Sequence, residues 1–151
     1  DAEGRIILAD ALDYAKEFKP ELIIDIATLT GACVVALGHE AAAILGNEKG
    51  EAWYEALKES GSRAGERVWP MPMFEEYEYL IETPVADVKN TGGRDAGTIT
   101  AAKFLQRFAE PRPWVHVDIA GAAWCDKERG VRPKGGNGFG VRLFLDFLDR
   151  F

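Results

Sequence analysis

Residues 22–27 read LIIDIA, a short apolar run that contains three isoleucines. Apolar side chains occupy both alternating positions, which is typical of a strand buried on both faces in a sheet with helices on each side. Asp25 interrupts the run. Because a buried carboxylate needs hydrogen-bond donors, Asp25 either orients a neighbouring loop or takes part in catalysis, and the sequence favours the first role.

Helical and strand-like segments alternate on either side of this run. Upstream, apolar residues at positions 8, 11, 12, 15 and 18 have the spacing of an amphipathic helix that Pro20 ends. Downstream, we expect strands at 41–46 and 114–124 and helices at 51–64, from about 98, and at 140–151. The last of these should pack Val141, Phe144, Leu145 and Leu148 inward. The alternation predicts an α/β fold in one structural unit, a mixed β-sheet sandwiched between α-helices.

Composition narrows the class of protein. The chain has 151 residues, of which 47% are hydrophobic, enough for one continuous core. Its net charge of −7, without a basic stripe, argues against a nucleic-acid partner. The apolar runs are far shorter than the roughly 20 residues of a membrane helix, so we expect no membrane partner and a cytoplasmic location. Cys33 and Cys125 are too few and too distant for a disulfide framework, and Cys33 suits the core.

The first five residues, DAEGR, combine two acids with a cation. If they are extended, Asp1, Glu3 and Arg5 leave the same face of the backbone. Two oxygen ligands beside a permanent cation could then hold a divalent metal and neutralise an anionic intermediate. Alternatively, the segment is the acidic start of the following helix, with its carboxylates near the positive end of the helix dipole. Spacing alone favours the second interpretation.

Two further segments carry candidate chemistry. Residues 90–98, NTGGRDAGT, could cradle a phosphate before a helix, but they match neither a P-loop nor G-x-G-x-x-G, so a tight loop beside a catalytic cleft is the preferred interpretation. In the strand at 114–124, His116 and Asp118 share one face. They could form a metal or acid–base pair, although a hydrogen-bonded core histidine is the more common arrangement. His39 is assigned no role.

Five segments, taken in order, resemble the carboxy-terminal half of the catalytic domain of the leucyl aminopeptidase (cytosol aminopeptidase) family. DAEGR resembles the larger part of that family's NTDAEGR signature. The other segments are DIATLTGACVVALG (25–38), VADVKNTGGRDAGTITAAKFLQRF (85–108), WVHVDIAGAAW (114–124) and GVRLFLDFL (140–148). The resemblance implies that residues 1–151 form the carboxy-terminal half of a zinc-peptidase-like catalytic domain whose upstream half is absent.

The resemblance also implies a function: a two-metal aminopeptidase that removes the N-terminal residue, preferably leucine-like, from peptides. Asp1 and Glu3 would be metal ligands, with Glu3 bridging both ions, and Arg5 the catalytic arginine that holds a bicarbonate. Thr28, Leu29 and Gly31 would bind substrate, Leu29 through its backbone carbonyl. The metals would be zinc or manganese, with magnesium as a further candidate, and the protein a homohexamer, the assembly of the family.

The family's two-metal site also requires a lysine and aspartates from upstream of NTDAEGR, and a second, catalytic lysine. We therefore expect this chain, as a truncated polypeptide or a proteolytic fragment, to bind metal weakly and to lack peptidase activity alone. Two alternatives remain open. The chain could be a catalytically silent α/β binding module that uses the loop at 90–97 for anionic ligands, or a folding unit with no function of its own.

Overall fold

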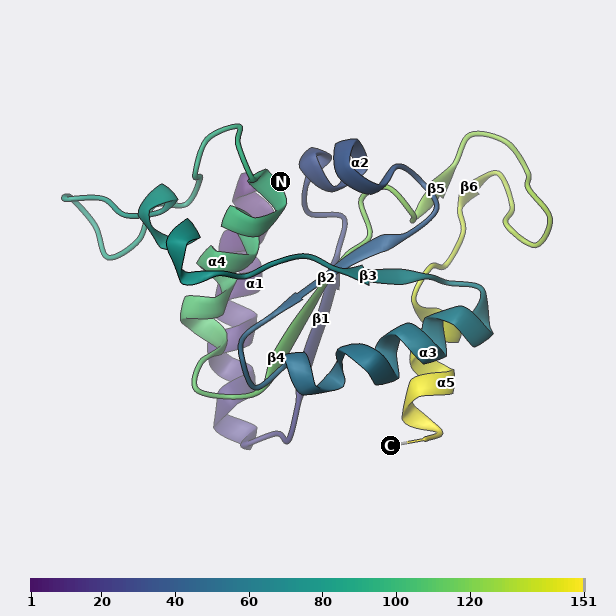
Figure 1. Ribbon diagram of the computed structural model, residues 1–151, viewed down its shortest axis with the longest axis horizontal. Helices are drawn as coiled ribbons and strands as arrows, with labels where there is room; N and C mark the ends of the chain where they lie inside the picture. Colours follow the sequence, from purple (N-terminus) through teal and green to yellow (C-terminus); the bar gives the residue numbers. More distant parts are fainter. Residues whose placement is uncertain (151) are drawn as a thin grey trace.

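The computed structural model describes residues 1–150, which form a four-stranded mixed sheet between helices (Figure 1). The strands are β1 (Ile23–Ala27), β2 (Ala42–Gly46), β3 (Val68–Pro70) and β4 (Trp114–Asp118), in the order β1-β4-β2-β3. β4 runs parallel to β1 and antiparallel to β2, and β3 runs parallel to β2. The predicted α/β fold with a mixed, helix-covered sheet is confirmed.

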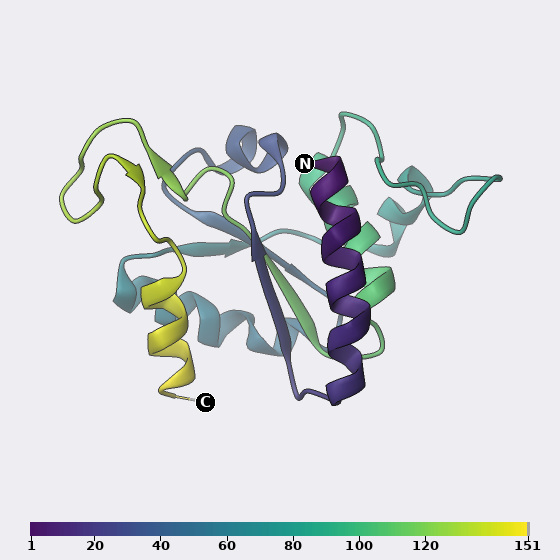
Figure 2. The ribbon, with the colours of Figure 1, turned by 180° about the vertical axis from the view of Figure 1, so that it is seen from behind.

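Helices cover both faces of the sheet. α1 (Ala2–Ala15) and α4 (Gly97–Ala109) lie side by side on one face, and α3 (Tyr54–Ala64) and α5 (Val141–Leu148) lie on the other (Figures 1 and 2). α2 (Gly31–Leu37) follows β1. Shorter elements are the 3-10 helices η1 (Lys16–Phe18), η2 (Glu51–Trp53) and η3 (Glu75–Leu80), and a small hairpin of β5 (Trp124–Cys125) and β6 (Gly135–Gly136). None of the helices among the described residues has the length and apolarity needed to cross a bilayer.

The alternation of side chains along the strands divides the core into two clusters. On β2, Ala43 and Leu45 face α1 and α4, whereas Ala42 and Ile44 face α3 and α5. Strand β4 divides in the same way, with Trp114 in the first cluster. A period of two therefore gives a strand in the middle of the sheet one apolar contact surface on each side.

Of the four residues of α5 that the sequence predicts to face inward, Phe144 packs against the core and the other three do not. Val141, Leu145 and Leu148 are 61%, 66% and 64% exposed, and the buried residues are Leu143 and Phe147. Six of the eight residues of this helix are apolar, so its apolar face is wide, and packing decides which part of that face is buried. The choice depends on a distant residue, because the buried carboxylate of Glu66 accepts hydrogen bonds from the first turn of the helix.

Strand β1 is also less buried than predicted. It forms the edge of the sheet, and Ile26 is 38% exposed. Ile24 and Ile26, with Leu22 and residues of α5, line an apolar groove of about 520 Å³. The apolar pattern of LIIDIA suits a strand covered on both faces, whereas in this chain one face of β1 is only partly covered.

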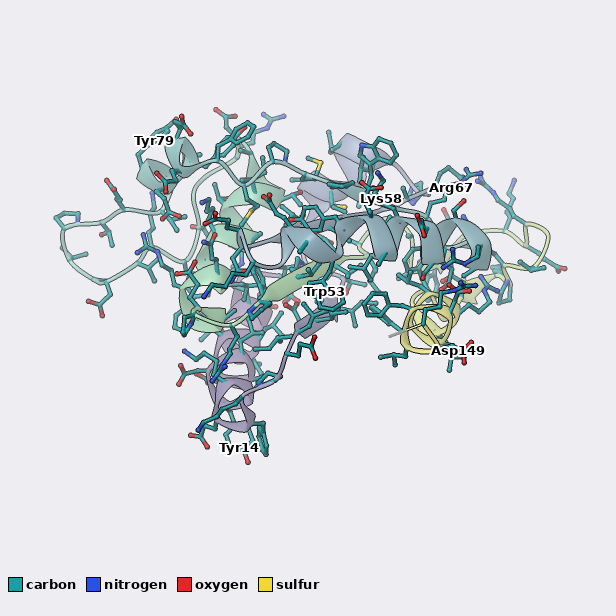
Figure 3. All side chains as sticks on the ribbon, turned by 60° about the horizontal axis from the view of Figure 1, so that its bottom comes forward. Tyr14, Trp53, Lys58, Arg67, Tyr79 and Asp149 are labelled. Atoms are coloured by element: carbon teal, nitrogen blue, oxygen red, sulfur yellow. The ribbon has the colours of Figure 1, made fainter. Side chains whose placement is uncertain are left out.

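Tyr14 and Trp53, both labelled in Figure 3, each contact another aromatic ring. Tyr14 lies at the end of α1 farthest from the helix start and is exposed, with its ring in edge contact with Phe18. Phe18 is 70% exposed, so the predicted inward stripe of this helix ends before it. Trp53 lies beneath α3 in that view, and its ring meets Phe147 at 6.2 Å between centroids. Trp53 therefore helps to join the α3 end of the molecule to α5.

Candidate functional site

A cleft of about 650 Å³ lies where β1 ends. Asp1 and Arg5 contribute to it from the start of α1. One wall comes from residues within 29–36, which connect β1 to α2 and continue into that helix, and the opposite wall is residues 91–100. The glycine-rich segment therefore forms a tight loop beside a cleft, as predicted.

The cleft brings together four of the six predicted site residues. Asp1, Arg5, Leu29 and Gly31 line it, although 24 positions separate the second from the third in sequence. Glu3 and Thr28 are not among the lining residues, and both are exposed. The conformation of DAEGR explains why Asp1 and Arg5 line the cleft and Glu3 does not.

The extended interpretation of DAEGR is wrong, because helix α1 begins at Ala2. Asp1 is the N-cap, and its carboxylate accepts a hydrogen bond from the backbone N–H of Gly4 at 3.1 Å. In a helix, residues four apart share a face and residues two apart do not. Asp1 and Arg5 therefore reach the same cleft, whereas Glu3 leaves the helix in another direction. The alternative of an acidic helix start is confirmed.

A steric constraint explains why position 4 is a glycine. A Cβ at Gly4 would collide with the carboxylate of Asp1, which lies directly against the backbone there. Any larger residue would have to displace the capping carboxylate or move the first turn of the helix. Gly4 thus allows Asp1 to cap the helix.

Arg5 is buried, with 6% of its surface exposed. Its Nη1 donates to the backbone carbonyl of Asn90 at 2.7 Å, and Asn90 Nδ2 donates to the carbonyl of Ala2 at 2.8 Å. Burial lowers the pKa of Arg5, and the negative charge of Asp118 opposes that shift. Arg5 Nε is buried and has no hydrogen-bond partner among the described residues. The guanidinium is thus held by Asn90 and keeps an unused donor.

Asp118 holds the segment that includes Leu29 and Thr30. The Asp118 side chain is fully buried at the end of β4. Its Oδ1 accepts from the backbone N–H groups of Leu29 at 3.2 Å and Thr30 at 3.4 Å, and its Oδ2 accepts from the Thr30 hydroxyl at 2.6 Å. The connection between β1 and α2 therefore takes its position from a neighbouring strand.

His116 does not join Asp118 in a metal or acid–base pair. Its Nδ1 lies 2.5 Å from Asp25 Oδ1, and Trp114 Nε1 donates to Asp25 Oδ2 at 2.6 Å. Burial opposes protonation of His116, but the charge and hydrogen bond of Asp25, then the charge of Asp118, outweigh it and raise the pKa of His116. His116 is a hydrogen-bonded core residue, the favoured interpretation. Asp25 orients two side chains of β4, Trp114 and His116, and not a neighbouring loop as predicted.

Comparison with known proteins identifies the family. A profile described as the cytosol aminopeptidase family, catalytic domain, matches residues 1–145. The chain is 55% identical over 150 residues to a probable cytosol aminopeptidase of Geobacter sp. (strain M21), with 99% of this chain covered, and 56% identical over 150 residues to that of Chlorobaculum tepidum, with 98% covered. This chain belongs to the cytosol aminopeptidase family. The resemblance inferred from DAEGR and the four later segments is confirmed.

The chain spans about 30% of the length of these relatives. The matched part is 30% of the Geobacter protein and 29% of the Chlorobaculum protein. Among residues 1–150, no group of three or more histidine, cysteine, aspartate or glutamate side chains is placed to hold a metal ion.

Two residues of the site escaped the sequence analysis. The sequence pattern places Asn90 in a glycine-rich loop, yet it contacts α1 through both its backbone carbonyl and its side-chain amide. For Asp118 the pattern suggests only a pairing with His116. The available signal for Asp118 was its position as the last residue of an apolar strand, where a buried carboxylate needs donors from a neighbouring segment.

Both cysteines are free thiols. Cys33 is 1% exposed and belongs to the core on the α1 and α4 side, as predicted. Burial, followed by the charge of Asp118, raises the pKa of the Cys33 thiol to about 11. Cys33 therefore remains protonated near neutral pH and has no part in nucleophilic chemistry.

Proposed function

We propose that this chain is the carboxy-terminal part of the catalytic domain of a two-metal aminopeptidase, which removes a leucine-like N-terminal residue from peptides. The observation that carries the proposal is the cleft that gathers Asp1, Arg5, Leu29 and Gly31 from distant parts of the sequence. Membership of the cytosol aminopeptidase family supports the reaction class, a hydrolysis of peptides.

Asp1 and Glu3 are proposed as metal ligands. The family is in general metal-dependent, but this segment alone does not fit two metals, since no group of three or more potential ligands comes together among residues 1–150. The other ligands would come from the part of the relatives that this chain does not match. We propose zinc or manganese, with magnesium as a further candidate, because carboxylate ligation suits all three.

Arg5 is proposed as the catalytic arginine. A guanidinium stays protonated in proteins, so burial leaves a permanent positive charge at the cleft. Its buried Nε has no partner among the described residues, and a bound bicarbonate would supply the missing acceptor, which supports the proposed bicarbonate. The hydrogen bond to Asn90 holds the guanidinium in place, and a fixed charge favours electrostatic stabilisation of developing charge.

Thr28, Leu29 and Gly31 are proposed to bind substrate. Leu29 is buried, and Asp118 accepts from the Thr30 N–H, which shares a peptide plane with the Leu29 carbonyl, so that carbonyl has a defined direction. Apolar side chains of Ala32, Val35 and Met71 also line the cleft, and they support a preference for a leucine-like residue. The discrimination expected for each methylene is about 1–3 kcal/mol.

The location and assembly are proposed from the family resemblance: a cytoplasmic homohexamer. The exposed apolar residues of α5, Val141, Leu145 and Leu148, support burial of that helix against other polypeptide. We also propose that the 151 residues alone bind metal weakly and do not hydrolyse peptides, because the donor set is incomplete.

The test uses a leucine anilide with added zinc or manganese. We compare the chain alone, the chain joined to the upstream part of the Geobacter relative, and the joined protein with Arg5→Ala. We expect activity only in the joined protein, with a loss of at least a hundredfold on Arg5→Ala. Arg129→Ala, an exposed arginine of another loop, is the matched control and should retain full activity. A folded joined protein that binds metal but leaves the anilide intact would remove the peptidase proposal.

A second candidate function is a silent module that binds anions. The specific observation in its favour is that Arg5, with its unpartnered Nε, and Arg94 line the same cleft as the start of α4. Calorimetric titration with inorganic phosphate in metal-free buffer distinguishes the two. Micromolar binding by the chain alone, lost on Arg94→Ala, would favour the binding module.

A further inference from the structure

The carboxylate of Asp118 lies behind the cleft, outside its lining. It is fully buried and accepts four hydrogen bonds. Three come from the backbone N–H groups of Leu29, Thr30 and Ala120, at 3.2, 3.4 and 3.1 Å, and the fourth comes from the Thr30 hydroxyl at 2.6 Å. Every partner is a donor, so the carboxylate acts here only as an acceptor.

The direction of the adjoining hydrogen bonds follows from this. Since Thr30 gives its single hydroxyl hydrogen to Asp118, the contact of 2.9 Å between the Thr30 and Thr98 hydroxyls must be donated by Thr98. The Thr30 oxygen also accepts from the backbone N–H of Cys33 at 3.1 Å. The hydroxyl of Thr30 is therefore fully used, and a directed chain runs from Thr98 through Thr30 to Asp118.

This chain of hydrogen bonds joins the two walls of the cleft. Thr30 caps α2 and lies in the wall formed by residues 29–36, whereas Thr98 is in the first turn of α4 and lies in the wall formed by residues 91–100. Both threonines are more than nine-tenths buried. The walls approach closely here, since a Cβ at Gly97 would lie 3.0 Å from the Cβ of Ala32. A link at this point sets how far apart the walls stand.

We propose that Asp118 is a positioning residue, which through Thr30 and Thr98 sets the spacing of the cleft walls and hence the size of N-terminal side chain that is accepted. The inference rests on the proposed aminopeptidase function. Asp118 touches no substrate in this arrangement. It acts by orienting the Leu29 and Thr30 amides and by fixing the Thr30 hydroxyl, which connects the start of α2 with α4.

The test uses the chain joined to the upstream part of the Geobacter relative and measures kcat and KM for leucine, methionine and alanine anilides. Thr98→Val removes the donor at nearly constant volume, and Asp118→Asn disturbs the acceptor. We expect each to lower the preference for leucine over alanine in kcat/KM about tenfold, mainly through KM for leucine. Thr98→Ser keeps the hydroxyl and should restore the wild-type preference.

Asp25→Asn is the matched control. Asp25 is a buried carboxylate on the strand beside β4, but its partners are Trp114 and His116 and none lies in the cleft. It should lower thermal stability and leave the leucine preference unchanged. If Asp118→Asn and Thr98→Val alter the preference no more than Asp25→Asn, the positioning role is overturned. If the wild-type joined protein cleaves none of the anilides, the proposed function itself fails, which is a different result.

Discussion

Removal of the Asp25 carboxylate should destabilise the chain strongly. In Asp25→Ala, His116 Nδ1 and Trp114 Nε1 both lose their acceptor, and both side chains are fully buried. A buried donor left without a partner costs about 1–3 kcal/mol, and breaking a buried charged pair costs about 3–5 kcal/mol. The two partners share one carboxylate, so we expect a loss of about 3–5 kcal/mol in the free energy of unfolding.

Urea unfolding followed by circular dichroism measures this loss. Asp13→Ala is the control, because Asp13 is exposed and pairs with Lys16 across one helical turn, an interaction worth at most about 1 kcal/mol. A loss below about 1 kcal/mol for Asp25→Ala would refute the reasoning, since it would mean that water or another group satisfies both donors.

The pair of Asp25 and His116 also predicts that the free energy of unfolding depends on pH. The pKa of His116 is raised in the folded state, so the stabilisation is fully present below the unfolded value of about 6.5 and is lost as pH rises through the folded pKa. Three charged groups act on His116: Asp25 on the neighbouring strand, Asp118 on the same strand and Arg5 on α1. The difference in stability between wild type and His116→Gln should therefore shrink above the folded pKa. A difference that grows with pH would contradict the assignment.

Three further predictions concern separate parts of the fold. Asp1→Ala should remove the N-cap and lower the free energy of unfolding by about 1 kcal/mol in a urea titration. Asp1→Asn should keep the cap and the stability, and calorimetry should show that it lowers only the affinity for metal. Glu66→Ala should cost roughly 2–4 kcal/mol, because two buried N–H groups at the start of α5 lose their acceptor; an unchanged melting temperature would contradict this. At pH 8 a thiol reagent should label Cys125 well before Cys33, whose pKa is raised to about 11, and equal rates would refute its burial.

The local pattern of the sequence predicted the elements more reliably than their faces. The buried residues Ile99, Ala102 and Leu105 follow the helical period of α4, and β2 matches the predicted strand at 41–46, whereas the strand predicted at 114–124 ends at Asp118. Helix α2 does not follow from the sequence pattern, although Thr30 is a favourable N-cap, because the residues that follow it, GACVVAL, include a glycine and two valines, which are poor helix formers. The family was recognisable because ordered motifs extend along the whole chain.

The sequence by itself determined the fold class, the family and which short segments carry the site. Only the tertiary structure decided that Asp1 and Arg5 share a cleft with residues 29–36 and that α5 turns Leu143 inward. The deciding contacts join residues far apart in the chain: Arg5 with Asn90 at a separation of 85 positions, Thr30 with Asp118 at 88, and Glu66 with Leu143 at 77. The periodic spacing of apolar residues indicates which side chains are buried. It cannot specify the partner of a buried polar group, because that partner depends on how distant segments pack.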